Sequence, residues 1–519
     1  MNEIQISYNQ LLSLALPQVI VVATALIAMS VDLLALRRSA TATRFSVASL
    51  LGCVGCGIAI TRIAIAPVHA NFANGALIGN QFTDVAQIAI LALTITTLLL
   101  AADSTFTRHI GEYVLLILLA TVGMLFLVAT QDLLVIFISI ELLSLSLYIL
   151  AAFNKQSRFS GEAALKYFLF GGMSAAFLLF GFSILYGIAN STSLSQIALS
   201  ISARSPDHAL TPLLVIGIVT VVIGLGFKVA AAPFHFWAPD VYQAAPAPSA
   251  AFIASGSKVA SFIVFFQLAA IGLAGAEGTA TLRHFIRGWV PVIAIIAAIS
   301  MLLGNFVAIR QRSVRRLLAY SAVAHAGYML LALTAHTQQS LASLVYYVVT
   351  YSVATIGAFA VLGTIEARTG SDLMADLAGL SRREPVLAFC LGLFLLSLAG
   401  IPPLAGFFGK FYLFVAALQS APGSMPLLWL VILAIATSAV SLYYYLRVLK
   451  AIYITVPQTP QTKFGAVLTL EQPRSITAVP SLTLTRIVVI LLAAAIAILG
   501  SAPNLILHPI LNAIQSSGL

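Results

Sequence analysis

The chain has 519 residues, of which 61% are hydrophobic and only 8% are charged, and its mean hydropathy is +1.04. A soluble domain carries about 25% charged residues. This composition therefore excludes a water-soluble protein and predicts an integral membrane protein whose first partner is the lipid bilayer. The net charge of +10 does not indicate binding to nucleic acid, because the basic residues lie in short loops between apolar segments.

Apolar segments long enough to cross a bilayer, which takes about 20 residues, follow one another along the whole chain. Fourteen of them begin near Leu11, Arg44, Phe82, Tyr113, Asp132, Ala163, Thr211, Pro246, Phe285, Arg316, Leu341, Pro385, Met425 and Arg486. The first has no basic region before its apolar run, which argues against a cleavable signal peptide. We predict an all-α integral membrane protein with about 14 transmembrane helices.

The distribution of basic residues over the loops predicts the orientation. If the N-terminus lies outside, the inside loops hold 18 of the 26 basic residues. The outside loops then hold three, Arg204, Arg283 and Arg287. One missed span would place every later loop on the opposite face of the membrane. The uneven distribution of basic residues therefore also supports the number of predicted spans. By the positive-inside rule, both termini are predicted on the outer face of a bacterial plasma membrane.

The cysteines and the loop motifs give no sign of a redox or nucleotide site. Cys53 and Cys56 form a CxxC pair inside an apolar run, and Cys390 is the third cysteine. Three cysteines do not supply the usual four thiolates of an iron–sulfur cluster, so we interpret them as helix-packing residues. The sequence has neither a GxGxxG after a strand nor a GxxxxGK[ST] loop. No cofactor is predicted in this chain.

Four ionisable residues lie deep inside predicted spans: Glu141, Lys228, Lys258 and Lys410. A charge at the bilayer centre costs at least about 2.5–3.5 kcal/mol on insertion scales, so such residues usually have a role. A buried lysine is a natural proton carrier, because burial favours the neutral amine and a nearby carboxylate favours the ammonium. Glu141 could modulate Lys228 in this way. The alternative is a static ion pair that locks two helices.

Two of these lysines lie beside predicted helix breaks. Lys228 comes just before Pro233 in the seventh span. Lys410 follows a break in the twelfth span that is made by Gly400, Pro402, Pro403 and Gly406. Proline removes a helix hydrogen bond, and unwound backbone in a membrane lines a cavity or is buried in protein. Five helices separate the two spans, so a repeat of that size must be inverted, as in many transporters. A kink used only for packing is the simpler alternative.

Three further residues are weaker candidates for a proton relay. His235 lies at the end of the broken seventh span, and His325 lies in the middle of the tenth. Histidine titrates near neutrality and can pass protons, although a lone core histidine is more often only hydrogen-bonded. Lys166 lies about one turn inside the sixth span, where it could also extend toward the interface.

Four long motifs resemble the proton-pumping antiporter-like subunits of respiratory NADH:quinone oxidoreductase, or complex I. They are IELLSLSLYILAAF (140–153), FKVAAAPFHFWAPDVYQAAPAP (227–248), RRLLAYSAVAHAGY (315–328) and GIPPLAGFFGKFYLF (400–414). The resemblance covers nearly the whole chain. The N type of subunit fits best, because the M type is expected to carry glutamate where Lys410 stands and because the chain has no long lateral helix after the last span.

The resemblance implies a domain organisation and roles for the candidate residues. It implies N-terminal helices one to three (1–110), two inverted five-helix repeats (111–273 and 285–453), and an inner loop with the last helix (454–519). Glu141 would modulate Lys228, Lys258 would be the central link and Lys410 the exit-side lysine. Lys166, His235 and His325 match further positions of the polar axis. FMN, iron–sulfur clusters and quinone are expected in partner subunits, and other membrane subunits of complex I are the expected partners.

Two other functions remain open from the sequence. A subunit of a multisubunit cation/proton antiporter or of a membrane-bound hydrogenase would share the fold and the lysines. An independent secondary transporter would be expected to show more varied polar groups at its broken helices than lysines and one glutamate.

Overall fold

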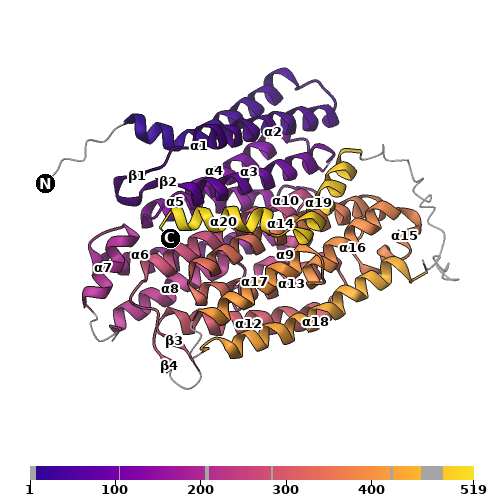
Figure 1. Cartoon of the computed structure of the whole chain (residues 1–519). Helices are drawn as coiled ribbons and strands as arrows, with labels where there is room; N and C mark the ends of the chain where they lie inside the picture. Colours follow the sequence, from indigo (N-terminus) through magenta and orange to yellow (C-terminus); the bar gives the residue numbers. More distant parts are fainter. Residues whose placement is uncertain are drawn as a thin grey trace.

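Apolar helices that lie side by side along one direction make up almost all of the computed structural model (Figure 1). The structure describes residues 8–104, 106–204, 210–281, 285–420, 425–456 and 483–518. In these ranges, twelve helices are long and apolar enough to cross a membrane, and four other apolar helices are shorter. The seventh and twelfth predicted spans each coincide with a pair of short helices, so the total of about 14 spans stays a prediction.

The helices are given in chain order, and the first group ends at Lys228. They are α1 (Tyr8–Ser30) with the π-helical turn η1 (Val31–Ala35), α2 (Thr41–Ile65), α3 (Gln81–Ala102), α4 (Ile110–Val128), α5 (Leu133–Ala151), α6 (Arg158–Ala189), α7 (Leu194–Arg204) and α8 (Pro212–Lys228). The middle of the chain forms α9 (Trp237–Ala244), α10 (Ala247–Ala254), α11 (Gly256–Gln267) with η3 (Leu268–Gly272), α12 (Trp289–Ile309), α13 (Val314–Ala335) and α14 (Gln338–Thr369). The remainder forms η4 (Met374–Leu377), α15 (Leu380–Arg383), α16 (Pro385–Ala399), α17 (Ala405–Gln419), α18 (Leu428–Tyr453), α19 (Thr483–Ser501) and α20 (Asn504–Ser516).

The helix starts lie within about five residues of the predicted ones, and one predicted start falls in a strand. Phe285, the predicted start of the ninth span, belongs instead to a short strand, and the helix begins at Trp289. The strands form two hairpins that hydropathy did not predict. They pair β1 (Ala70–Phe72) with β2 (Leu77–Gly79), which are joined by η2 (Ala73–Gly75), and β3 (Thr279–Ala280) with β4 (Phe285–Ile286).

Two non-helical segments interrupt the bundle beside lysines. Residues 229–236 separate α8 from α9, and residues 400–404 separate α16 from α17. Gly400 ends α16 in a left-handed conformation (φ +85°) that suits glycine. Side chains satisfy freed backbone groups at both places: Ser300 accepts from the Ala232 N–H at 2.8 Å, and Ser397 accepts from the Gly406 N–H at 3.1 Å. Such partners are what allows unwound backbone inside a membrane protein.

A third interruption lies in the predicted eighth span and was not anticipated. Ser255 separates α10 from α11 with φ −123° and ψ −84°. Its hydroxyl donates to the Ala251 carbonyl at 2.6 Å, which competes with the helical hydrogen bonds. Lys258 follows three residues later. All twelve residues of α11 are buried, so this break lies at the centre of the molecule.

Matching contacts in the two halves support an internal repeat. The Leu133 N–H donates to the Thr192 carbonyl at 2.9 Å, and the Val314 N–H donates to the Asp372 carbonyl at the same distance. In the first half, a β-bridge links the start of α5 to the segment that follows the 32-residue helix α6. In the second half, a β-bridge links the start of α13 to the segment that follows the 32-residue helix α14. The elements just after these bridges, α7 and α15, lie at opposite ends of the bundle (Figure 1). This arrangement is expected of an inverted repeat.

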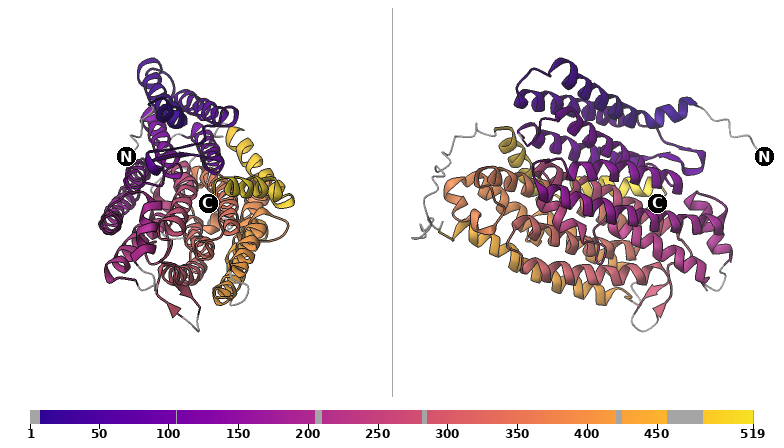
Figure 2. Two further views of the ribbon diagram at one scale, coloured as in Figure 1. Left: turned by 60° about the vertical axis from the view of Figure 1, so that its left-hand side comes forward. Right: turned by 180° about the vertical axis from the view of Figure 1, so that it is seen from behind.

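The outermost elements complete the bundle. The N-terminal helices α1 and α2 form one edge, and α20 lies against α14 and α3 (Figure 2). Neither α7 nor α20 was predicted as a separate helix, because each is short and amphipathic rather than continuously apolar. Both are built from segments that hydropathy alone assigns to loops or to the end of a span.

Candidate functional site

Lys228 is the last residue of α8 and reaches α5. Its ammonium donates to the Ser144 hydroxyl and lies 5.8 Å from the centre of the Tyr148 ring. The Phe227 ring lies at 5.6 Å on the other side. Backbone N–H groups of residues 229–231 satisfy the carbonyls of Leu225, Gly226 and Phe227 at the end of α8. The Lys228 side chain therefore lies between a capped helix end and two rings.

Lys228 contacts Ser144 rather than Glu141 in this structure, and the modulation of Lys228 by Glu141 stays a prediction. Among the described residues Glu141 has no ion pair, and its buried Oε1 has no hydrogen-bond partner. The reason lies in helix geometry, because Glu141 lies one turn from Ile138 and Leu145, both of which are exposed on the outer face of α5. Ser144, one turn further along α5, is the residue that the Lys228 ammonium contacts.

Lys258 and Lys410 are almost completely buried, at 1% and 4% exposure. Lys258 on α11 donates to the Ala322 carbonyl of α13 at 3.1 Å. Lys410 on α17 donates to the Ala399 carbonyl at 3.0 Å and to the Ser438 hydroxyl at 2.8 Å. Ala399 is the last residue of α16, so this carbonyl belongs to the negative end of the helix dipole.

His325 lies between these two lysines in a cluster of hydroxyl groups. Its Nδ1 is 2.6 Å from the Tyr347 hydroxyl and its Nε2 is 3.2 Å from the Tyr445 hydroxyl. Tyr445 is hydrogen-bonded in turn to Ser321. Each hydroxyl can donate or accept, so the chain of hydrogen bonds can reverse its direction, as a proton relay requires.

A second hydroxyl cluster adjoins the first. Asn305 donates to the Tyr328 hydroxyl at 3.1 Å and accepts from the Tyr444 hydroxyl at 3.2 Å. Tyr328 also contacts Thr437 at 3.4 Å. These polar side chains are buried, and their partners come from α12, α13 and α18.

His235 is buried at the break after α8 but lies apart from the lysines. It is 2% exposed, and its Nδ1 has no hydrogen-bond partner among the described residues. Its ring lies 6.1 Å from that of Tyr320, the residue before Ser321. His235 is thus adjacent to the cluster around His325 without being hydrogen-bonded to it.

Lys166 lies in a polar vestibule at one end of the bundle rather than on the buried axis. Its ammonium forms ion pairs with Glu162 at 2.8 Å and Asp240 at 3.0 Å. Asp240 also pairs with Arg316 at 2.7 Å. Lys166 is 42% exposed, so its charge is compensated and hydrated.

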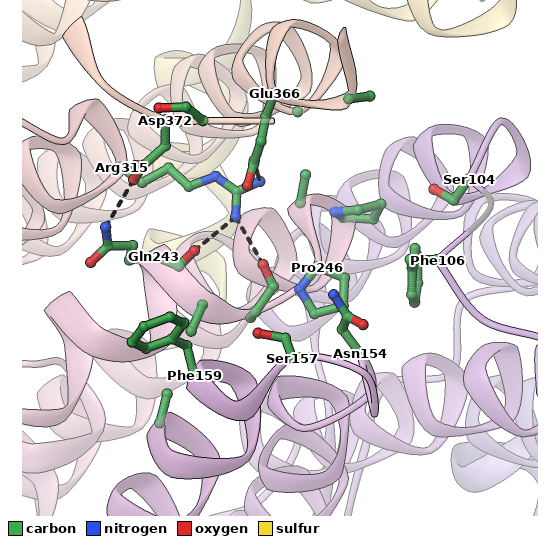
Figure 3. A pocket seen from close by; sticks show the side chains of 18 of the residues that line it. Ser104, Phe106, Asn154, Ser157, Phe159, Gln243, Pro246, Arg315, Glu366 and Asp372 are labelled. Carbon is green, nitrogen blue, oxygen red and sulfur yellow. Dashed lines mark hydrogen bonds and ion pairs between the residues drawn. The ribbon is translucent and has the colours of Figure 1, made fainter. Parts of the chain in front are cut away.

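The vestibule has a volume of about 1060 Å³ and is bordered by loops that were predicted on the inside. Its lining includes five acidic and three basic side chains, a net charge of −2 when all are ionised: Asp103, Glu162, Asp240, Glu366, Asp372, Lys166, Arg315 and Arg316. Figure 3 shows Arg315 at its inner wall. A negative cavity on a chain of net charge +10 attracts cations and protons.

Arg315 joins three elements at the floor of this vestibule. It is 3% exposed and donates to the carbonyls of Gln243 at 3.1 Å and Ala245 at 2.9 Å. It also forms an ion pair with Glu366 at 2.5 Å. Since Gln243 and Ala245 lie at the end of α9, Arg315 satisfies carbonyls that this helix leaves unpaired.

The sequence did not indicate most of the tyrosines and hydroxyls of the axis. Tyr347 and Tyr351 are one turn apart on α14, and the pair Tyr444–Tyr445 lies on α18. Tyrosine in an apolar helix is most often a packing residue, so the spacing alone carried little information. Only the approach of α14 and α18 to His325 gives these hydroxyls a role.

The fold and this axis define a class of protein. A multi-pass helical membrane protein with lysines beside interrupted helices, a buried histidine between them and a hydrated acidic vestibule has the architecture of a proton- or ion-translocating membrane subunit.

Comparison with known proteins identifies the family. The sequence profile described as NADH:quinone oxidoreductase/Mrp antiporter, transmembrane, matches residues 129–440. NADH-quinone oxidoreductase subunit N 2 of Acidobacterium capsulatum is 52% identical over 97% of this chain and 99% of its own length. The chain belongs to the NADH:quinone oxidoreductase/Mrp antiporter family, as its motifs predicted.

Solved structures show the same fold. A chain of respiratory complex I from Thermus thermophilus with bound aureothin is 32% identical, with a TM-score of 0.72, and the match covers 94% of this chain and 98% of that one. A chain of the Mrp complex from Dietzia sp. DQ12-45-1b has a TM-score of 0.78 at 20% identity and covers 97% of each chain. The second likeness shows the fold alone.

Proposed function

We propose that this chain translocates protons as the N-type membrane subunit of a bacterial NADH:quinone oxidoreductase. The observation that carries the proposal is the buried axis from Lys228 through Lys258 and His325 to Lys410. A relative that is 52% identical over nearly the full length bears the name of this subunit. The chain therefore works as one membrane subunit among others, and the energy for translocation comes from electron transfer between NADH and quinone.

The electron carriers are proposed to lie in partner subunits. The relative that is named as a subunit of NADH-quinone oxidoreductase, and the likeness to a chain of complex I, support placing FMN, the iron–sulfur clusters and quinone in those other subunits. Cys53 and Cys56 lie on the transmembrane helix α2, next to other packing residues. What this chain contributes is a path for protons.

The proposed path begins at the vestibule, on the inner face. Its net negative charge collects protons, and Lys166 and Asp240 hold a hydrated ion-pair network at its wall. Both termini are proposed on the outer face, consistent with the basic inside loops. The proton would leave near Lys410, beside the interruption between α16 and α17.

The lysines are suited to loading and release because their partners are weak. Lys228 is held by a hydroxyl, and Glu141 lies one helical turn from that hydroxyl. A movement of α5 or α8 that brings the carboxylate to Lys228 would stabilise the ammonium, and its withdrawal would release the proton. His325 passes the proton between Lys258 and Lys410 through its two hydroxyl partners, with His235 as an accessory group.

A substitution at the centre of the axis tests this function. We expect Lys258→Ala to lower NADH-driven proton pumping and NADH:quinone activity together, by about tenfold or more, because general acid–base groups contribute about 10²–10⁴-fold to proton transfer. Pumping is measured in inside-out membrane vesicles, and assembly of the complex is checked by native gel electrophoresis.

Lys155→Ala is the matched control. Lys155 is also a lysine of this chain, but it is exposed in the loop between α5 and α6, so its removal should leave both rates unchanged. Wild-type pumping and activity in a fully assembled Lys258→Ala complex would show that the lysine is structural, and the proposed path would be wrong.

A further inference from the structure

Two buried lysines of the axis have no carboxylate to balance their charge. Among the residues that the structure describes, neither Lys258 nor Lys410 forms an ion pair. Their hydrogen bonds go to backbone carbonyls and, for Lys410, to one hydroxyl. An ammonium in so dry a place needs further compensation.

A tyrosine ring faces each of the two ammonium groups. The Lys258 nitrogen lies 5.3 Å from the centre of the Tyr351 ring, and the Lys410 nitrogen lies 5.2 Å from the centre of the Tyr328 ring. Both distances are within the roughly 6 Å at which the negative face of an aromatic ring attracts a cation, and the attraction strengthens when the pair is desolvated.

The same two rings also flank His325. The His325 ring centre lies 5.1 Å from that of Tyr351 and 5.8 Å from that of Tyr328. The order is therefore Lys258, Tyr351, His325, Tyr328, Lys410, with one aromatic ring between the histidine and each lysine. Tyr351 lies on α14 and Tyr328 on α13, whereas Lys258 lies on α11 and Lys410 on α17. The two rings therefore connect these four helices.

A ring differs from a carboxylate as a partner for a proton-carrying lysine. It attracts the ammonium but has little attraction for the neutral amine, and it binds the charge less strongly than a carboxylate does. A lysine held by a ring is thus stabilised when loaded and remains free to give up its proton. A permanent ion pair would hold the proton more tightly.

We propose that Tyr351 and Tyr328 are positioning residues whose ring faces hold the loaded Lys258 and Lys410 and place His325 between them. This inference rests on the proposed function, in which the two lysines carry protons. The face of the ring, rather than the phenol hydroxyl, is the part that acts on the lysine.

Tyr351 offers the cleaner test, because the Tyr328 hydroxyl is also tied to Asn305 and Thr437. The complete complex is prepared with Tyr351→Phe, with Tyr351→Leu, and with a trifluorinated phenylalanine at position 351. The fluorinated ring keeps the shape of phenylalanine but loses most of the negative charge on its face. It therefore separates the electrostatic role from packing even if the leucine variant assembles poorly.

We expect Tyr351→Phe to pump within about twofold of wild type, whereas the fluorinated ring lowers NADH-driven pumping by about fivefold or more, since a desolvated cation–π contact is lost. Tyr351→Leu should lose at least as much. Tyr346→Leu on the same helix is the matched control: Tyr346 is fully buried, and among the described residues no lysine lies over its ring. It should pump within about twofold of wild type.

Equal pumping by the phenylalanine and the fluorinated variants would overturn the inference, as would a loss in Tyr346→Leu that matches the loss in Tyr351→Leu. Lys258→Ala in the same membranes distinguishes this failure from that of the proposed function. If Lys258→Ala stops pumping while the ring series has no effect, the proton path stands and only the role of the rings is wrong.

Discussion

Buried charges in this protein fall into two kinds, distinguished by the strength of their partners. Arg44 and Asp32 form a bidentate pair at 2.6 and 2.7 Å, and Asp32 also accepts from the Gly111 N–H at 2.9 Å. Among the residues that the structure describes, the three axis lysines have only hydroxyl groups, carbonyls and rings as partners. Strong pairs fix helix ends, whereas the lysines keep weak partners that let a proton leave.

Gly400 shows how closely the backbone surrounds one of these lysines. A Cβ added there would lie 3.1 Å from the Cδ of Lys410 and 3.3 Å from its Nζ. Gly370 provides a matched control, because it also ends a helix with positive φ (+74°), yet an added Cβ would meet no heavy atom within 4 Å.

We expect Gly370→Ala and Gly400→Ala each to cost about 1–2 kcal/mol of stability, the penalty of an L-residue in a left-handed conformation. Only Gly400→Ala should also slow pumping, by roughly fivefold, because it displaces Lys410 from its partners. Thermal denaturation and pumping assays on assembled complexes measure the two effects. Equal pumping in both variants would argue that the position of Lys410 is not critical.

At the scale of elements, two arginines of α13 hold the short helix α9. Arg316 pairs with Asp240 on α9, and Arg315 contacts both the end of α9 and the carboxylate of Glu366 on α14. Because α9 has eight residues and follows an interruption, it has few helical hydrogen bonds of its own. Arg315 therefore keeps the broken seventh span in place against the second repeat.

Arg315→Met should destabilise the subunit by about 1–3 kcal/mol, since the buried α9 carbonyls lose their donor and the partly exposed Glu366 loses its ion-pair partner. The midpoint of thermal unfolding of the complex measures this loss. Adding Glu366→Gln should restore part of it, because the uncompensated carboxylate is gone. Arg312→Met, at an exposed arginine of the same loop, is the control. An unchanged midpoint in Arg315→Met would contradict this account of α9.

At the scale of the whole molecule, hydropathy and the cost of buried charge predicted the spans and the lysines, because both are local properties of the sequence. An inverted repeat was also predicted, since Pro233 and the prolines Pro402 and Pro403 near Lys410 occupy corresponding spans. The repeat boundaries at residues 111–273 and 285–453 remain a proposal, which the matching bridges at Asp132 and Ser313 support.

Features that depend on which helices meet could not be predicted. Lys228 donates to Ser144, one helical turn from Glu141, and the local sequence does not indicate this partner. Tyr351 reaches Lys258 because α14 packs against α11. The sequence contains these residues at ordinary helical spacings, and only the packing of distant segments gives them partners.

The central claim is that Lys258 and Lys410 belong to one continuous proton path, and double substitution tests it most directly. Proton pumping per electron pair is measured for Lys258→Ala, for Lys410→Ala and for the double variant, each in assembled complexes. If both lysines serve one path, the double variant pumps no more slowly than the slower single variant, because a path already blocked loses nothing more. A double variant whose loss equals the product of the two single losses would contradict the claim and show that the lysines act independently.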